Sequence, residues 1–179
     1  GLVAVSLLTA LFAAANWHWL RANLVTYGWD RLDHLITSLV YRDTLGSITP
    51  RSLLAALAYS DYYPPLVHYG AALLYRLFGV DEDVAVMVNV VYMAVLLGAT
   101  WWIGHRLRGP WTGVLAAALL GLFPMIFAMS RYLYLDFALT ALVALNYLLI
   151  CKHFPDGGGG YSAAREQARL LAVLAALIV

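Results

Sequence analysis

The sequence predicts an all-α fold, a polytopic bundle of membrane helices with an outer loop of interfacial amphipathic helices. The chain is 63% hydrophobic and only 12% charged, and its mean hydropathy of +0.77 lies above that of soluble domains. Most of its early charge lies between Arg21 and Pro65, in a polar interval flanked by apolar segments. We therefore expect a multi-pass integral protein of a bacterial or archaeal inner or plasma membrane, or of the endoplasmic reticulum.

Charge and cysteine content exclude other classes. The net charge is +1 and the basic residues form no cluster, so the chain lacks the electrostatic footprint of a nucleic-acid-binding protein. Cys151 is the single cysteine, which rules out a disulfide within the chain.

The apolar runs predict the membrane spans. A helix needs about 20 apolar residues to cross a bilayer. The first run ends at Trp17 and Trp19, an aromatic pair typical of the membrane interface. We expect residues 1–179 to be the N-terminal part of a single transmembrane catalytic domain. The expected spans are 1–19, 84–104, 111–130 and 132–151, followed by the start of another at 169–179.

The outer loop, residues 21–80, contains shorter helical patterns. Apolar residues recur at helical spacing from Leu32 to Val40, which predicts an amphipathic helix on the membrane surface. A second short helix, 51–58, follows the breaker Thr49-Pro50, and Pro64-Pro65 opens a segment that ends at Phe78.

Charge predicts the orientation. The turn from His105 to Gly109 has two arginines and no acid, so it should face the cytoplasm. An odd number of crossings must then separate it from the outer loop, and 84–104 supplies one. Residues 64–78 should therefore lie along the outer interface. The same count places Ser130 to Asp136 on the same face as Asp30.

Small residues predict close helix packing inside the bundle. Gly113, Ala117 and Gly121 recur at four-residue intervals, which lets a neighbouring backbone approach. Pro124 should bend this helix near its outer end and leave the carbonyl of Leu120 without its usual partner.

Two acids are candidates for chemistry, and each also has a structural interpretation. Asp30 precedes the amphipathic helix, where it is either an N-cap or a general base flanked by aromatic residues that hold a sugar or lipid. Asp136, with Arg131 nearby, either caps and anchors its helix or serves a site. An acid within a bilayer costs roughly 2.5 to 3.5 kcal/mol, so such acids usually have a partner or a task.

No cofactor is certain, but a divalent metal is a candidate. Asp30, Asp33 and His34 have the i, i+3, i+4 spacing that brings ligands to one helix face, although surface helices often carry such residues without a metal. Asp61 is either a turn residue or a third acid of the site. For the other histidines, His18, His68, His105 and His153, positions at the membrane belt or surface suffice.

The order of these features resembles the membrane-embedded C-type glycosyltransferases, especially the protein O-mannosyltransferase and aminoarabinose transferase group of glycosyltransferase family 39. The resemblance covers nearly the whole chain. It consists of a first span, an outer loop with an early Asp, the segment Tyr63-Pro64-Pro65-Leu66, an Arg-rich inner turn, and Arg131 followed by Asp136.

The resemblance implies transfer of a sugar from a polyprenyl-phosphate-linked donor to a hydroxyl of a protein, lipid or glycan acceptor at the outer membrane face. Asp30 would be the general base and Asp136 the second catalytic acid. Arg31 follows Asp30 where the family often has Glu, and Asp33 is the candidate substitute. The substrate-binding candidates are Asp33, His34, Asp61, Tyr63, Arg131 and Tyr134.

Two other classes remain open. A transporter or lipid flippase could use the outer acids to bind an ion or a lipid head group, and a structural membrane subunit would need no site. Transporters usually place ionisable groups near the bilayer midplane and often contain repeats. The midplane segments here are apolar and show no repeat, which favours an enzyme.

Overall fold

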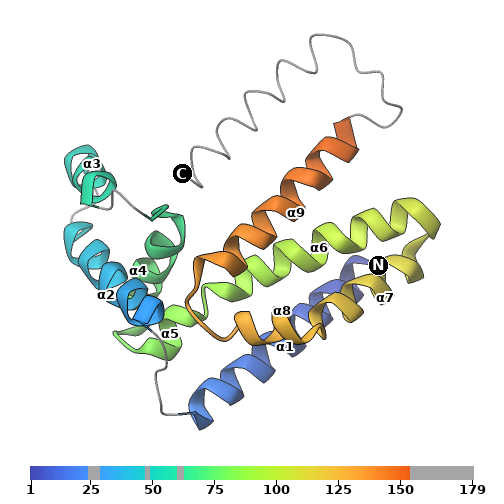
Figure 1. The fold of residues 1–179 in the computed structure, drawn as a ribbon, viewed down its shortest axis with the longest axis horizontal. Helices are drawn as coiled ribbons and strands as arrows, with labels where there is room; N and C mark the ends of the chain where they lie inside the picture. The colour runs from blue at the N-terminus through green and yellow to red at the C-terminus, as the bar shows by residue number, and fades with distance from the viewer. Residues whose placement is uncertain (24–28, 47–48, 60–62, 154–179) are drawn as a thin grey trace.

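The computed structural model describes residues 1–23, 29–46, 49–59 and 63–153, and within them every regular element is a helix (Figure 1). The all-α prediction is therefore confirmed. The elements are α1 (Leu2–Ala22), α2 (Trp29–Thr44), α3 (Pro50–Tyr59), α4 (Leu66–Phe78), α5 (Glu82–Val86), α6 (Asn89–Arg108), α7 (Pro110–Gly121), α8 (Pro124–Met129) and α9 (Leu135–His153).

Helix α6 is the centre of the bundle, since it packs against α1, α7 and α9. Its buried side chains, such as Met93 and Leu97, join Phe12 of α1 and Phe137 of α9 in one apolar core. Burial of these side chains against one another fixes how the three neighbours lie around α6.

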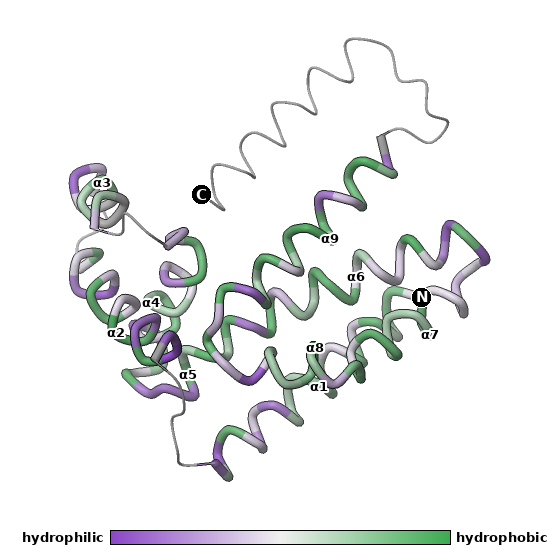
Figure 2. Tube along the Cα trace, viewed as in Figure 1, coloured by the Kyte–Doolittle hydropathy of each residue, from purple (hydrophilic) through white to green (hydrophobic). Residues whose placement is uncertain are grey.

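Three stretches are long and apolar enough to cross a membrane: Leu2–Ala22, Glu82–Arg108 and Leu135–Lys152. Their outward surfaces stay apolar, with Leu7, Val91 and Val143 more than half exposed. Figure 2 shows hydrophobic residues along the bundle and hydrophilic residues toward its ends, around α2 and α5 and at the turn that joins α6 to α7. An apolar exterior of this extent suits lipid rather than water, so the chain is a multi-pass membrane protein.

The expected span 111–130 is not one continuous helix. It is divided into α7 and α8 by a break at Leu122 and Phe123, directly before Pro124. As predicted, Pro124 cannot supply the usual N–H partner of the Leu120 carbonyl, and the backbone N–H of Phe123 donates to this carbonyl instead at 3.0 Å. A tight turn therefore replaces the bend, and it satisfies that carbonyl before the chain continues.

The close packing predicted for the small residues is confirmed, with two different neighbours. Gly113 lies against α6, where a Cβ would come within 3.0 Å of the backbone nitrogen of His105. A Cβ on Gly121 would collide with the ring of Phe12 on α1, and Ala117 is completely buried. The small residues thus seat α7 between α6 and α1.

The outer loop contains the predicted helices, and both sides of α2 mix apolar and polar residues. Leu32 and Ile36 are half exposed, and their neighbour Asp33 is also exposed. The buried residues of α2 include Leu35 and Tyr41 as well as Arg31, His34 and Ser38. The short helix expected at 51–58 is α3. The segment after Pro64-Pro65 forms α4, which is not among the helices long enough to span, and its position along the outer interface stays a prediction.

Candidate active site

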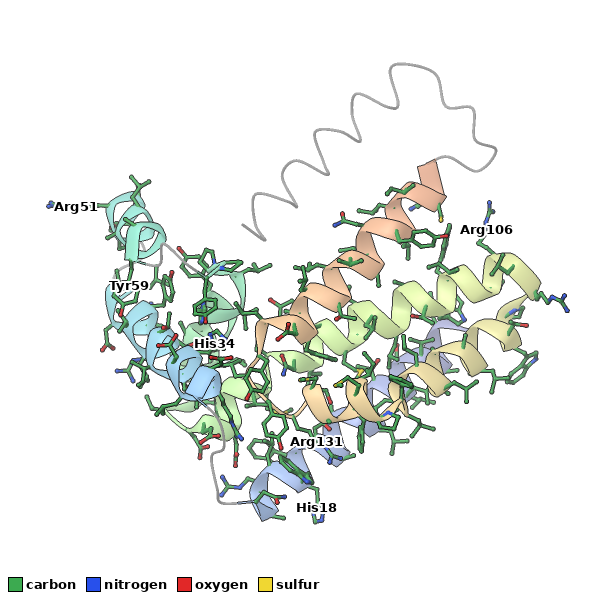
Figure 3. The ribbon with its side chains drawn as sticks, in the orientation of Figure 1. His18, His34, Arg51, Tyr59, Arg106 and Arg131 are labelled. Carbon is green, nitrogen blue, oxygen red and sulfur yellow. The ribbon has the colours of Figure 1, made fainter. Side chains whose placement is uncertain are left out.

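The outer loop meets the bundle at the N-terminal end of α6. Arg21, at the end of α1, pairs with Asp81 at 3.4 Å and with Asp83 at 3.3 Å. His34 and Arg131 lie toward this end, and Arg106 lies at the opposite end of α6 (Figure 3). The basic inner turn and the acidic loop are therefore at opposite ends of the bundle, as the orientation argument requires.

Asp30 and Asp136 occupy equivalent places on their helices. Each is the second residue of its helix and lies in the first turn, Asp30 on α2 and Asp136 on α9, and both are exposed. Asp30 lies in the first turn of α2, and the residues directly before Trp29 lie outside the described part of the chain, so the N-cap interpretation of Asp30 stays a prediction. Among the residues that the structure describes, neither carboxylate accepts a hydrogen bond or forms an ion pair.

The two acids act on a common neighbour. Burial lowers the pKa of His34, and the charges of Asp33, Asp30 and Asp136 oppose this by raising it. Three carboxylates from α2 and α9 are thus close enough to one imidazole to influence its protonation. Asp30 and Asp136 are 106 positions apart in the chain, but they share one polar region around His34.

His34 is joined to a second buried histidine, His68 of α4. Nδ1 of His34 lies 3.1 Å from Nε2 of His68, so one ring donates a hydrogen bond to the other. His68 is completely buried, and the surface position expected for it was wrong. Burial, together with the nearby His34, lowers the pKa of His68 to about 4, and the Pro64 backbone opposes this shift. Both rings are therefore neutral at pH 7.

Aromatic rings enclose the histidine pair. Tyr63 meets His34 edge to face with ring centroids 4.7 Å apart, and Tyr41 stacks on His68 at 5.7 Å. This places two predicted binding residues, His34 and Tyr63, in contact with each other.

Arg131 is a half-buried cation on the turn between α8 and α9. Its Nε donates to Oδ1 of Asn16 at 3.1 Å, and its guanidinium lies 3.8 Å from the centroid of Phe127 and 5.1 Å from that of Trp19. Burial lowers the pKa of Arg131, but an arginine stays charged at pH 7. Within the described part of the chain it forms no ion pair. Its charge is available to an anion.

Arg31, by contrast, is neutralised. It is almost completely buried, pairs with Glu82 of α5 and lies 5.0 Å over the ring of Tyr132. Tyr134 follows with its ring 5.9 Å from that of Tyr132. Arg31 therefore ties α2 to α5 and to the turn before α9.

An apolar groove of about 170 Å³ opens between α4 and α9. Leu135 and Leu139 of its wall flank Asp136 in the sequence. The groove is lined by Pro64, Leu66 and Val67 on one side and by Leu135, Ala138, Leu139 and Leu142 on the other. An apolar surface thus adjoins the polar region.

The donors present do not favour a metal. In the described residues no group of three His, Cys, Asp or Glu side chains could hold an ion. Nδ1 of His34, which would belong to the metal set expected from α2, faces His68 instead. Asp61 lies outside the described residues.

Three residues of this region were missed by sequence reasoning, namely His68, Glu82 and Asn16. A signal for Asn16 was present, because it is the one amide side chain between Leu2 and Leu20, in a run that should be in lipid. No comparable signal pointed to His68 or Glu82, whose partners lie in α2.

Comparison with known proteins is consistent with this arrangement. Residues 63–162, more than half of the chain, match the family model described as dolichyl-phosphate-mannose-protein mannosyltransferase. No curated protein and no solved structure matches the chain. The matched range contains Tyr63, Arg131, Tyr134 and Asp136, and Asp30 lies before it. The chain belongs to the dolichyl-phosphate-mannose-protein mannosyltransferase family and is a membrane glycosyltransferase of the mannosyltransferase type.

Proposed function

We propose that the protein transfers a sugar from a polyprenyl-phosphate-linked donor to an acceptor hydroxyl at the outer face of the membrane. The observation that carries this proposal is the Arg131 guanidinium, which is half buried on aromatic rings and has no ion-pair partner among the described residues. Such a cation suits the phosphate of a lipid-linked donor, because charge-assisted hydrogen bonds from arginine bind phosphate strongly.

The reaction needs a base and a stabilised leaving group. The carboxylate of Asp30 accepts the proton of the acceptor hydroxyl, and the acceptor oxygen forms a bond to the anomeric carbon of the sugar. The bond between that carbon and the phosphate oxygen breaks, and its electron pair leaves with the polyprenyl phosphate. Arg131 offsets the charge that develops on this phosphate. Asp30 is exposed at the helix end, so an acceptor can reach it.

The donor is itself a membrane lipid, and the groove between α4 and α9 offers an apolar surface for its chain. The groove wall includes Leu135 and Leu139, which flank Asp136 in the sequence. A lipid held there would keep its isoprenoid units on apolar side chains while its head group meets the polar region.

The direct test is Asp30→Asn in the full-length protein, with transfer of labelled sugar from a polyprenyl-phosphate mannose donor as the readout. We expect transfer to fall by at least about a hundredfold, the usual contribution of a general base. Asp43→Asn is the matched control, because Asp43 is an exposed acid at the other end of the same helix.

Both variants should elute as folded protein in size-exclusion chromatography. Transfer by Asp30→Asn at the wild-type rate would remove the assignment of the base. Absence of transfer and of polyprenyl-phosphate binding by the wild-type protein would remove the proposed function.

A further inference from the structure

Two asparagines from two spanning helices hold the turn that carries Arg131. Asn16 of α1 donates from Nδ2 to Oγ of Ser130 at 2.8 Å and accepts from Nε of Arg131 at 3.1 Å. Asn89 of α6 donates from Nδ2 to the backbone carbonyls of Ser130 at 3.2 Å and Tyr132 at 2.8 Å. Side chains distant in the sequence thus converge on three consecutive residues.

These contacts are formed where water has little access. Asn16 is 5% exposed, Asn89 is 2% exposed and Ser130 is 1% exposed. An amide in such surroundings costs free energy unless its hydrogen bonds are made, and in a bilayer the alternative partners are lipid tails. The Nδ2 and Oδ1 atoms of Asn16 bond to Ser130 and Arg131, respectively. The positions of Ser130 and Arg131 are therefore coupled through Asn16.

The residue at position 16 determines whether the charge of Arg131 is neutralised. A carboxylate there would hold the guanidinium equally well and would also neutralise it. The amide oxygen holds Nε without a formal charge, and the rings of Phe127 and Trp19 cover the guanidinium without pairing it. The site therefore fixes the cation while leaving it free to bind an anion.

We propose that Asn16 is a positioning residue for the phosphate of the donor, acting through Arg131. Its amide orients the guanidinium by its Nε and leaves the terminal nitrogens and the net charge for the phosphate. This inference rests on the proposed function, since it takes Arg131 as the phosphate-binding cation. The side chain of Asn89 supports the same turn by donating to the turn's backbone carbonyls.

The decisive variant is Asn16→Asp, which preserves the shape of the side chain and the acceptor for Nε but adds a negative charge beside Arg131. The probe is geranyl phosphate, a short isoprenoid monophosphate, and the readout is its dissociation constant for the full-length protein in detergent. We expect the constant to rise by about tenfold or more, because a charge-assisted contact to phosphate is replaced by an internal ion pair.

Two controls separate this effect from loss of structure. Asn16→Asp also removes the amide donor to Ser130. Ser130→Ala removes the same bond, together with the one that its hydroxyl donates to the Phe127 carbonyl at 2.9 Å, but leaves the contact between Asn16 and Arg131 in place. Thr9→Val is the control within α1, because the hydroxyl of Thr9 bonds only to Val5 of its own helix. Both controls should bind geranyl phosphate within about twofold of wild type. A Ser130→Ala variant as weak as Asn16→Asp would overturn the inference, because Asn16 would then act by supporting the turn.

A double-mutant cycle gives an independent measurement should Asn16→Asp fail to fold. Asn16→Ala should weaken binding in the wild-type background and have no further effect in an Arg131→Ala background. Equal effects in both backgrounds would overturn the inference. If Arg131→Ala weakens binding and no Asn16 variant does, the inference alone fails. If Arg131→Ala leaves binding unchanged, the phosphate site of the proposed function fails as well.

Discussion

Arg31 of α2 and Glu82 of α5 form an ion pair whose arginine is 4% exposed, and the same guanidinium covers the ring of Tyr132. This one cation connects three segments, namely α2, α5 and the turn before α9. The pair thus helps to hold Asp30, one residue before Arg31, at the same end of the bundle as Asp136.

Removing the acid should therefore destabilise the protein. Glu82→Gln leaves Arg31 buried without its counter-charge, which costs about 3 to 5 kcal/mol for fully buried pairs and about 2 to 3 kcal/mol here, because Glu82 is partly exposed. Thermal unfolding in detergent measures the change. Asp83→Asn should cost less than about 1 kcal/mol, because its partner Arg21 is more than half exposed and stays hydrated without the pair. Similar losses for the two variants would contradict the structural importance of Arg31.

The histidine pair predicts sensitivity to acid. The pKa of His68 falls from 6.5 to about 4 on folding, and that of His34 is also lowered. Below pH 6.5 the unfolded chain therefore binds protons that the folded chain does not, so stability falls as the pH drops from about 6.5 toward 4. For His68 the loss reaches about 3 kcal/mol at most.

Melting temperatures at about pH 7.5, which is above this window, and at about pH 4.5, which is near its lower edge, would test the acid sensitivity. His68→Asn should melt with a shallower dependence on pH, since it removes one of the two titrations. His18→Asn, at an exposed histidine, should retain the wild-type dependence. Parallel curves for wild type and His68→Asn would show that the pair does not govern acid stability.

Glycine packing predicts a contrast between two positions of the bundle. Gly113→Ala places a methyl group against the α6 backbone near His105, and overpacking of this kind costs about 1 to 3 kcal/mol. Gly98→Ala on α6 meets nothing within 4 Å and should be neutral or slightly stabilising. Detergent stability of the two variants gives the comparison, and a tolerant Gly113 would mean that α7 does not approach α6 so closely.

The apolar groove predicts a dependence on donor chain length. Leu139→Trp should fill the groove and raise the KM for a long-chain polyprenyl-phosphate donor by about tenfold, equivalent to about 1.4 kcal/mol of lost contact. The KM for a short-chain donor should change much less. Val143→Trp, one turn further along α9 and outside the groove, is the control. Equal effects of Leu139→Trp on both donors would place the isoprenoid chain elsewhere.

The sequence predicted much of the architecture because membrane spans and charge bias are local signals. Apolar runs located α1, α6 and α9, and counting the crossings placed Asp30 and Asp136 on one face without any contact being known. The helical spacing from Leu32 to Val40 predicted α2. What periodicity could not supply was which side of α2 packs inward.

The missed features depend on pairs that only the folded chain brings together. His34 and His68 lie in different helices, and each is an ordinary residue in its own segment. Arg31 looked like a departure from an Asp-Glu pattern, and its glutamate partner comes from α5 instead. The position of Pro124 predicted a bend in its span, but not the tight turn in which the N–H of Phe123 bonds to the carbonyl of Leu120.

Two polar side chains of α2 are buried, which limits how this segment can be studied alone. Arg31 and His34 reach their partners, Glu82 of α5 and His68 of α4, only in the folded chain. A peptide of α2 in aqueous buffer would keep the sequence around Asp30 but lose both contacts. The surroundings of the candidate base are therefore made by the assembled helices, and an excised fragment is no substitute for the intact protein.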